Sequence, residues 1–497
     1  MEFNQQIKNL IENGFFRNLS IERGIEKESL RVDQGGNISQ KTHPQSLGSS
    51  FTNPSITTDF AEALLEIVTP VYTNVDDLYD CLLALHVFIS KGLDEEEMLW
   101  PYSIPPRISN ESEINIATYS ESNMGQLKHI YRKGLAVRYG KTMQCVSGIH
   151  YNFSLSDNSI KQLISSSEQK DIDSAYLSLI RNFKRLFWFV LTEFGESAVV
   201  DKSFVNGRDN DLDELNSTDV FKKGATSLRM SEVGYQSKAQ KSLNIKYNDL
   251  DSFLGEVREA IVKPYPEFEA LGIKDSMGNF QQISNGILQI ENELYDCIRP
   301  KRAADSNRRP YEVLKEEGIK YVEVRGIDLS PNEVTGISKN QIRILDLILL
   351  HCLIMPSPIM TDKEKSQIEK NDQLTIKFGR DSATKIIYKG NEVNIQDARS
   401  DVIKELTSIA TAMDNDAYMD ALNQLRKNEN TFNSSESFHN LGIELAKENL
   451  EKLKSFAEID LTKFFDEAAE SLEKFDKIQG ESVSDMNEFM DSYNKKI

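Results

Sequence analysis

Apolar residues recur along this chain with two periods, one typical of helices and one typical of strands. Asn74 is a suitable helix cap, and an apolar stripe with helical spacing follows it, so we predict a helix over 74–98. The stripe consists of Leu78, Leu82, Leu85 and Ile89. The segment 174–200 has a similar pattern and is also predicted to be helical. Further amphipathic helical patterns extend from about 398 to 428 and from 433 to the C-terminus.

Three segments alternate apolar and polar residues with a period of two, which predicts strands that each bury one face. They cover residues 146–155, 286–299 and 320–329. The polar faces carry ionisable groups instead of the Lys, Thr and Ser of an ordinary solvated sheet. Those groups include His150, Glu291, Glu293, Tyr295, Glu323 and Arg325. We therefore expect the polar faces to line a cavity.

The character of the sequence changes near residue 360, beyond which Lys, Glu, Asp and Asn become dense. A chain of 497 residues can hold more than one domain. We predict a first part, 1–360, that contains the strands, and a mainly helical C-terminal region, 361–497, packed on it. The charge runs of the C-terminal region are interpreted as solvated helix faces.

Composition narrows the class of protein. Hydrophobic residues make up 39% and charged residues 27%, as in soluble globular proteins. No apolar run approaches the roughly 20 residues that span a bilayer, and the N-terminus has no apolar core typical of a signal peptide. The four widely spaced cysteines indicate a reducing cytosol. The formal net charge of −20 argues against nucleic acid as a partner.

Several carboxylates occur where an unpaired charge would be costly. Glu26 and Glu28 are two residues apart and therefore share one side of an extended strand, and Glu66 lies within an apolar stretch. Taken singly, each fits a structural role, such as pairing with a nearby arginine. Together with Asp59 they favour a site for a hard divalent cation, because Mg²⁺ takes carboxylate oxygens and bridges them to phosphates. His150 fits either a structural role or a ligand of Mn²⁺ or Zn²⁺, since imidazole is an unusual Mg²⁺ ligand.

The sequence contains no recognised phosphate-binding loop. Its nearest approach, residues 134–142, has five residues between the glycines instead of four, and no GxGxxG motif occurs. If ATP is used, metal ions and basic side chains must hold its phosphates. The candidates are Arg299, Lys301, Arg302 and Arg325, of which the first three also fit an exposed basic surface.

Eight stretches, read together, resemble the glutamate–cysteine ligase family of the proteobacterial type. They cover about the first 350 residues in a consistent order, whereas 156–224 and the last 140 or so residues match loosely. The stretches are RGIEKESLRV (23–32), HPQSLGS (43–49), ITTDFAEALLEIVTP (56–70), LWPYSIP (99–105), YRKGLAVRYGKTMQCVSGIHYNFS (131–154), ATSLRMSEVGY (225–235), LQIENELYDCIRPKR (288–302) and YVEVRGID (321–328).

The resemblance implies an α+β, glutamine-synthetase-like fold, in which a curved antiparallel sheet forms a funnel-shaped active site surrounded by helices. Residues 1–360 would then be the catalytic ligase domain. The family's metal-binding positions fall on Glu26, Glu28, Asp59, Glu66, His150 and Glu323. Its cysteine pocket falls on Phe60, Tyr131, Leu135, Gln144, Arg229, Tyr235 and Tyr295. Arg325 falls on the position that contacts the transferred phosphoryl group.

The function implied by the resemblance is ATP-dependent ligation of the L-glutamate γ-carboxylate to the L-cysteine amine through a γ-glutamyl phosphate. This reaction opens glutathione biosynthesis and releases ADP and phosphate. We expect Mg²⁺ as cofactor, with Mn²⁺ also possible, and ATP as co-substrate. We further expect a cytoplasmic monomer that binds neither nucleic acid nor membranes.

Three other functions fit parts of the pattern. A carboxylate–amine ligase of the same fold with a different amine substrate is the nearest alternative, and a product assay separates the two. A metal-dependent hydrolase could use the carboxylates and His150 around an activated water, and it would need no ATP. The third alternative is a non-enzymatic binding or scaffolding protein, but such a protein would need no acidic sheet face turned toward a cavity.

Overall fold

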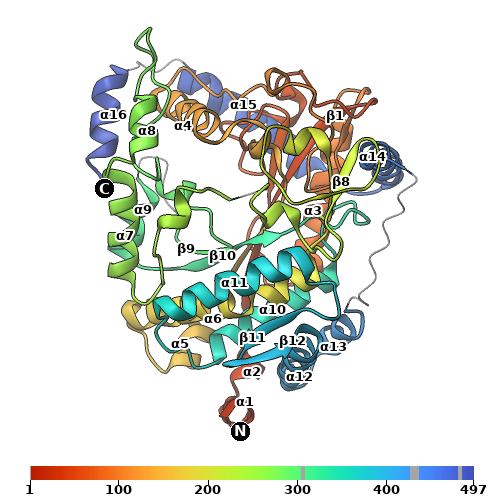
Figure 1. The fold of residues 1–497 in the computed structure, drawn as a ribbon, viewed down its shortest axis with the longest axis vertical. Coiled ribbons are helices and arrows are strands. Elements are labelled where there is room, and N and C mark those ends of the chain that lie inside the picture. The colour runs from red at the N-terminus through yellow and green to blue at the C-terminus, as the bar shows by residue number, and fades with distance from the viewer. Residues whose placement is uncertain (1, 235, 304–307, 426–435, 480–483) are drawn as a thin grey trace.

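An antiparallel sheet crosses the middle of the molecule, with helices on its sides (Figure 1). The structure is a computed structural model that describes residues 2–234, 236–303, 308–425, 436–479 and 484–497. The main sheet has the strand order β2-β3-β1-β5-β10-β9, and β4 pairs with β1. Its strands are β1 (Ile21–Asp33), β2 (Ile56–Thr58), β3 (Leu64–Val68), β4 (Glu97–Leu99), β5 (Ile149–Leu155), β9 (Ile298–Lys301) and β10 (Tyr321–Ile327).

The helices surround this sheet. They are α1 (Glu2–Glu12), α2 (Phe15–Asn18), α3 (Val75–Gly92), α4 (Asn123–Tyr139), α5 (Asp157–Ile164), α6 (Gln169–Phe194), α7 (Leu250–Val262), α8 (Pro266–Leu271), α9 (Pro310–Glu317), α10 (Lys339–Ile354), α11 (Asp362–Phe378), α12 (Ile395–Met413), α13 (Asp416–Asn423), α14 (Phe438–Ser455), α15 (Thr462–Gln479) and α16 (Met486–Asn494). Two small antiparallel units complete the fold: β6 (Val199–Asp201), β7 (Asp213–Glu214) and β8 (Asp219–Phe221), and the hairpin β11 (Lys385–Tyr388) with β12 (Asn391–Asn394). None of the described helices is long and apolar enough to cross a membrane.

The two-faced strands of the sequence analysis are confirmed for β5 and β10. Tyr151 and Phe153 of β5 and Val322 and Val324 of β10 are fully buried in the main hydrophobic core. This core lies on the side of the sheet where α6 packs against β10 and α3 packs against β1. Because successive side chains of a strand alternate between faces, the polar residues of these strands point to the opposite side.

Both predicted helices end earlier than expected, and only the first begins where predicted. Asn74 caps α3, accepting hydrogen bonds from the backbone of Asp76 and Asp77, yet the helix ends at Gly92 and residues up to 98 include the start of β4. The helix predicted over 174–200 is α6, which begins earlier, at Gln169, and ends at Phe194, before the chain enters β6 at Val199. The pattern that suggested 398–428 is divided between α12 and α13, and positions 426–428 and 433–435 lie outside the described residues.

The prediction of a strand over 286–299 was wrong for most of its length. A short 3-10 helix occupies Glu291–Glu293, and only Ile298 and Arg299 enter a strand, β9. The polar residues of the alternation are buried by specific partners: Glu293, which is 0% exposed, binds Arg138 at 3.1 Å. The alternation therefore arose from buried polar pairs, which periodicity cannot distinguish from a solvated strand face.

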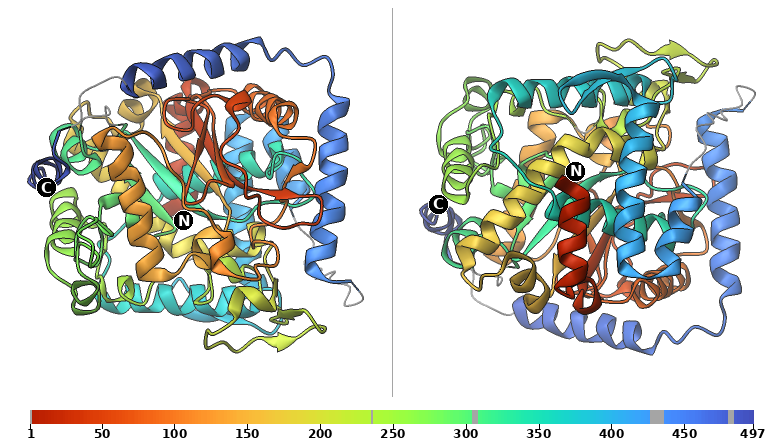
Figure 2. Two further views of the ribbon diagram at one scale, coloured as in Figure 1. Left: turned by 90° about the horizontal axis from the view of Figure 1, so that it is seen from above. Right: turned by 90° about the horizontal axis from the view of Figure 1, so that it is seen from below.

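The C-terminal region packs closely on the rest of the chain. Val402, Leu406 and Ile409 of α12 and Tyr418 of α13 belong to the same hydrophobic core as the main sheet. Figure 2 shows α14 and α15 along two adjacent sides of the molecule. The hairpin β11–β12 within this region was not expected from its helical pattern. A domain boundary near residue 360 stays a prediction.

Candidate active site

The polar face of the main sheet lines a cavity of about 530 Å³. Its floor is formed by β1, β3, β5 and β10, and its walls include α4, the segment 283–292 and α16. Among the predicted site residues, those that line it are Glu26, Glu28, Asp59, Phe60, Glu66, Tyr131, Leu135, Gln144, His150, Tyr295, Glu323 and Arg325. The structure thus brings together residues separated by up to 300 positions in the sequence.

The register of the sheet places the acidic side chains beside one another. In the pairing of β1 with β3, Glu28 lies opposite Glu66, and in the pairing of β1 with β5, Glu26 lies opposite His150. The imidazole of His150 contacts two carboxylates, with Nδ1 3.3 Å from Glu26 and Nε2 3.6 Å from Glu28. Glu28 also accepts a hydrogen bond from the backbone N–H of Gly148 at 2.8 Å.

Glu66 lies among the other carboxylates of this cluster. Burial raises the pKa of the Glu66 carboxyl group well above its usual value, and the neighbouring Glu26, Asp59 and Glu28 raise it further. Burial likewise raises the pKa of Glu28. Carboxylates that repel one another in this way are stabilised by a cation between them.

Glu323 has the opposite environment, because three basic side chains surround it. Arg299 approaches its carboxylate to 2.6 Å, Arg325 to 3.2 Å and Lys301 to 3.4 Å. Although burial opposes ionisation, these three cations hold the pKa of Glu323 well below its usual value. Arg299 and Lys301 therefore belong to the cavity and not to an exposed basic surface. Arg302, the remaining candidate, instead binds the carbonyl oxygen of Gly318 and pairs with Glu317.

The donor set fits a divalent cation that prefers oxygen ligands. Candidate ligand atoms of Glu26, His150 and Glu323 all lie within 4.8 Å of one another. Two ligands of one Mg²⁺ lie at most about 4.2 Å apart, given bonds of about 2.1 Å, so a small inward movement of these side chains would complete a site. The surplus of carboxylates over nitrogen donors favours Mg²⁺ or Mn²⁺ over Zn²⁺.

The residues predicted to hold cysteine form one end of the cavity. Phe60 and Leu135 are buried there, and the side-chain amide of Gln144 donates a hydrogen bond to the hydroxyl of Tyr295 at 3.1 Å. Tyr131 extends from α4 into the same space. Tyr235, the remaining predicted tyrosine, lies outside the described residues. This end thus offers apolar and hydroxyl groups suited to a small amino acid.

Arg229 lies outside the cavity lining in this structure. Its side chain is 2% exposed, its Nε binds Asp328 at 2.7 Å, and its Nη2 donates to the carbonyl oxygen of Ile327 at 2.8 Å. A side chain at Gly148 would approach Arg229 to within 2.8 Å, so the guanidinium packs directly behind that glycine. These contacts describe a buried ion pair, and the predicted contact of Arg229 with a substrate carboxylate stays a prediction.

We expect Arg229→Ala to lower the free energy of unfolding by about 3 kcal/mol or more, because it leaves the buried Asp328 without its cation. Urea denaturation followed by circular dichroism measures this loss. Arg229→Lys retains a charge near Asp328 and should lose less. A stability unchanged in Arg229→Ala, with only the KM for cysteine increased, would contradict the structural role.

Two features of the cavity were not found by sequence reasoning. Arg132 donates to the backbone carbonyl oxygens of Asp59 and Thr58, and it fixes the loop that carries Asp59 against α4. The helix α16 contributes Phe489 and Tyr493 to the wall. Arg132 sits in a helical segment among other basic residues, and α16 lies in a region with no distinguishing motif. The sequence pattern therefore did not indicate that either of them belongs to the cavity.

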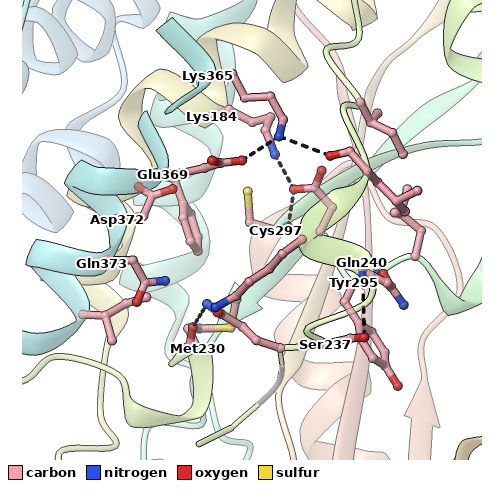
Figure 3. A pocket seen from close by; sticks show the side chains of 18 of the residues that line it. Lys184, Met230, Ser237, Gln240, Tyr295, Cys297, Lys365, Glu369, Asp372 and Gln373 are labelled. Atoms are coloured by element: carbon pink, nitrogen blue, oxygen red, sulfur yellow. Dashed lines mark hydrogen bonds and ion pairs between the residues drawn. The ribbon is translucent and has the colours of Figure 1, made fainter. Parts of the chain in front are cut away.

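A second cavity, of about 500 Å³, lies between α6, α11 and the segment 236–245. Two ion pairs lie in its lining: Lys184 with Asp296 at 2.5 Å, and Lys365 with Glu369 at 2.6 Å, the second of which can be followed in Figure 3. Of the predicted site residues that the structure describes, it contains only Tyr295. The acidic cluster belongs to the first cavity.

Known proteins are similar in sequence to most of this chain. A sequence model of the family "Glutamate-cysteine ligase" matches residues 7–375. A glutamate–cysteine ligase of Hahella chejuensis is 45% identical over 372 residues, which are 74% of this chain and 71% of that protein. The enzyme of the same name from Pseudomonas aeruginosa is 42% identical over 397 residues, 79% of this chain and 75% of that protein.

Solved structures extend the similarity to the whole fold. The crystal structure of glutamate–cysteine ligase from Francisella tularensis in complex with AMP superposes with a TM-score of 0.90 at 30% identity, covering 96% of this chain and 98% of that one. A bifunctional glutathione synthetase from Pasteurella multocida gives a TM-score of 0.70 at 23% identity, covering 97% of this chain and 59% of that one. The predicted α+β fold is confirmed.

Proposed function

Because this chain belongs to the glutamate–cysteine ligase family, it is a ligase that forms γ-glutamylcysteine from L-glutamate and L-cysteine with ATP, and we propose that the cavity on β1, β3, β5 and β10 is its active site. The observation that carries the proposal is the single cavity that contains the acidic cluster, Arg325 and an apolar pocket with tyrosines. The acidic cluster can bind metal ions, and these ions together with Arg325 can stabilise a phosphoryl group during its transfer. The apolar pocket can hold a small amino acid.

The acidic residues would hold Mg²⁺, or Mn²⁺, between the strands. When bound, such ions neutralise the charge of the nucleotide phosphates and of the glutamate carboxylate. The sheet itself supplies the positioning, since Glu28 and Glu66 face each other across β1 and β3. Glu323 is fixed by Arg299 before any ligand arrives, which keeps this carboxylate ionised at neutral pH.

The reaction needs an activated carboxyl group, because a free carboxylate is a poor acyl donor. Transfer of the γ-phosphoryl group of ATP to the glutamate γ-carboxylate gives an acyl phosphate and ADP. Arg325 shares a strand face with Glu323 and contacts its carboxylate. The guanidinium of Arg325 can therefore stabilise the negative charge that develops on the phosphoryl oxygens during transfer. The cysteine amine then attacks the acyl carbon, and phosphate leaves.

The pocket end of the cavity protects this intermediate. Tyr131, Tyr295 and Phe60 can close around cysteine and exclude water from the acyl phosphate, which water would otherwise hydrolyse. The Gln144–Tyr295 hydrogen bond holds one of these rings in place. The apolar and hydroxyl groups at this end, from Phe60, Leu135, Tyr131 and Tyr295, support cysteine as the amine substrate.

The activity itself is directly measurable. Purified protein with Mg²⁺, ATP, L-glutamate and L-cysteine should release ADP, phosphate and a γ-linked dipeptide in equal amounts, and chelation of the metal with EDTA should abolish turnover. Coupled ADP release, followed by mass spectrometry of the dipeptide, checks this result. An α-linked product, turnover without ATP, or an equal rate with other amines would contradict the proposal.

We also propose that the enzyme works in a reducing compartment, the cytosol. All its cysteines are buried free thiols, which agrees with such a compartment. They are Cys81, Cys145, Cys297 and Cys352.

A further inference from the structure

The helix α16 reaches the active-site cavity although it lies far beyond residue 375, where the match to the family ends. Its residues Phe489, Ser492 and Tyr493, and Lys496 just after the helix, contribute to the cavity lining. In Figure 1 it stands at the side of the molecule next to α8, with α4 nearby. The C-terminus therefore contributes to the substrate cavity.

Specific contacts hold α16 in this place. Met490 is 3% exposed and packs with Leu127 and Ile130 of α4 and with Ile283. Just before the helix, the backbone of Ser484 exchanges two hydrogen bonds of 3.0 Å with the side-chain amide of Asn123, the first residue of α4. The helix is thus docked by both apolar and polar contacts.

Tyr493 is fixed most firmly. The guanidinium of Arg309, which is 1% exposed, lies 4.4 Å from the centre of the Tyr493 ring and donates to its carbonyl oxygen at 3.3 Å. Arg309 in turn pairs with Glu291 at 2.6 Å. The next residue after Glu291 accepts a hydrogen bond from Arg299, the partner of Glu323. One continuous set of contacts therefore connects α16 to the acidic floor.

This wall of the cavity differs in character from the floor. The rings of Phe489 and Tyr493 lie 6.4 Å apart at an angle of 22°, and both belong to one apolar cluster with cavity-lining residues of α4 and the segment 283–290. Those neighbouring residues are Met124, Leu127, Tyr131, Ile283 and Ile290, so this wall adjoins the proposed cysteine pocket at Tyr131. The cavity thus combines an anionic floor with an aromatic and aliphatic wall.

We propose that α16 forms the wall that contacts the purine base of the nucleotide, with Phe489 and Tyr493 as specificity-determining residues. Of the three substrates only ATP carries a large apolar ring, and aromatic side chains bind such rings through their faces. The phosphates then extend toward Arg299, Lys301 and Arg325, which also line the cavity. This inference rests on the proposed use of ATP.

The test compares Phe489→Ala and Tyr493→Leu with the matched control Glu488→Ala. Glu488 is an exposed residue of the same helix that does not line the cavity. Calorimetric binding of MgADP should weaken about 5- to 10-fold in the first two variants, as expected for loss of one aromatic contact. The KM for ATP should increase by the same factor, and the preference for ATP over GTP should shrink. Glu488→Ala should match the wild type.

Each other outcome has a definite meaning. Unchanged MgADP affinity, or an increased KM for cysteine or glutamate alone, overturns the assignment of α16 to the base. Thermal unfolding shows whether Tyr493→Leu still folds, and Phe489→Ala provides the test if it does not, since Phe489 makes no ion pair or hydrogen bond with its side chain. A wild type that binds MgADP but forms no dipeptide would refute the proposed function and leave the α16 assignment standing.

Discussion

Glu66→Gln should turn over on the order of 1000-fold more slowly than the wild type and, in metal-free buffer at pH 7.5, unfold at a higher temperature. The loss of turnover follows from removal of a charged metal ligand at a centre where charge stabilisation dominates. The gain in stability follows from the electrostatics of the metal-free site, where Glu66 lies opposite Glu28 on the neighbouring strand. Most substitutions that abolish catalysis bring no such gain.

The pH dependence of this stability gain has a definite sign. The pKa of Glu66 is raised in the folded protein by burial and by its acidic neighbours. The contribution of Glu66 to folding stability is therefore complete only below the pKa of about 4.3 that glutamate has in the unfolded chain. This contribution is lost as the pH rises through the higher pKa of Glu66 in the folded protein. Glutamine carries no proton to lose. The difference in melting temperature between variant and wild type, measured in EDTA, should thus be larger at pH 7.5 than at pH 5.

Glu323→Gln is the matched control for Glu66→Gln. It removes another proposed metal ligand, but one that Arg299 and Lys301 hold in the folded protein. Breaking this buried pair should lower the free energy of unfolding by about 3 kcal/mol, with a loss of turnover similar to that of Glu66→Gln. A Glu66→Gln variant with kcat within about tenfold of the wild type would show that Glu66 is no essential metal ligand.

Arg325→Ala should lower kcat by about 1000-fold or more, because an arginine at a transferring phosphoryl group acts mainly on the transition state. Loss of a contact made only in the transition state lowers kcat and kcat/KM together. The KM values for glutamate and cysteine should therefore change little. Stability should also change little, since Glu323 retains Arg299 and Lys301 as partners. Steady-state kinetics with each substrate varied in turn measures these effects.

Arg302→Ala provides a comparison within the same stretch of basic residues. Arg302 binds Gly318 and Glu317 and does not line the cavity, so its removal should leave kcat within about twofold of the wild type, because no contact to the transition state is lost. An Arg325→Ala variant that raised only the KM for cysteine would place Arg325 at the cysteine carboxylate instead.

The sequence by itself predicted which side chains share a face, because the period of a strand is a local property of the backbone. Glu26 and Glu28 on β1, and Glu323 and Arg325 on β10, are two residues apart and lie on the cavity side for this reason. The same local reasoning failed for 286–299, where buried pairs such as Glu293 with Arg138 imitate the alternation of a strand. Periodicity shows that alternate positions are polar. It cannot show whether water or a buried protein partner forms the hydrogen bonds of those polar groups.

Only the tertiary structure decided which of these faces meet and what each charge contacts. The strand order β3-β1-β5-β10 brings Glu66, Glu28, His150 and Glu323 together, and this order depends on packing between segments far apart in the chain. The same packing pairs Glu323 with Arg299 and leaves Glu66 among acids, so two glutamates that look alike in the sequence acquire pKa shifts in opposite directions. It also brings α16 back over the cavity. Such contacts depend on how whole surfaces fit together in three dimensions. A local pattern of residues contains no information about that fit.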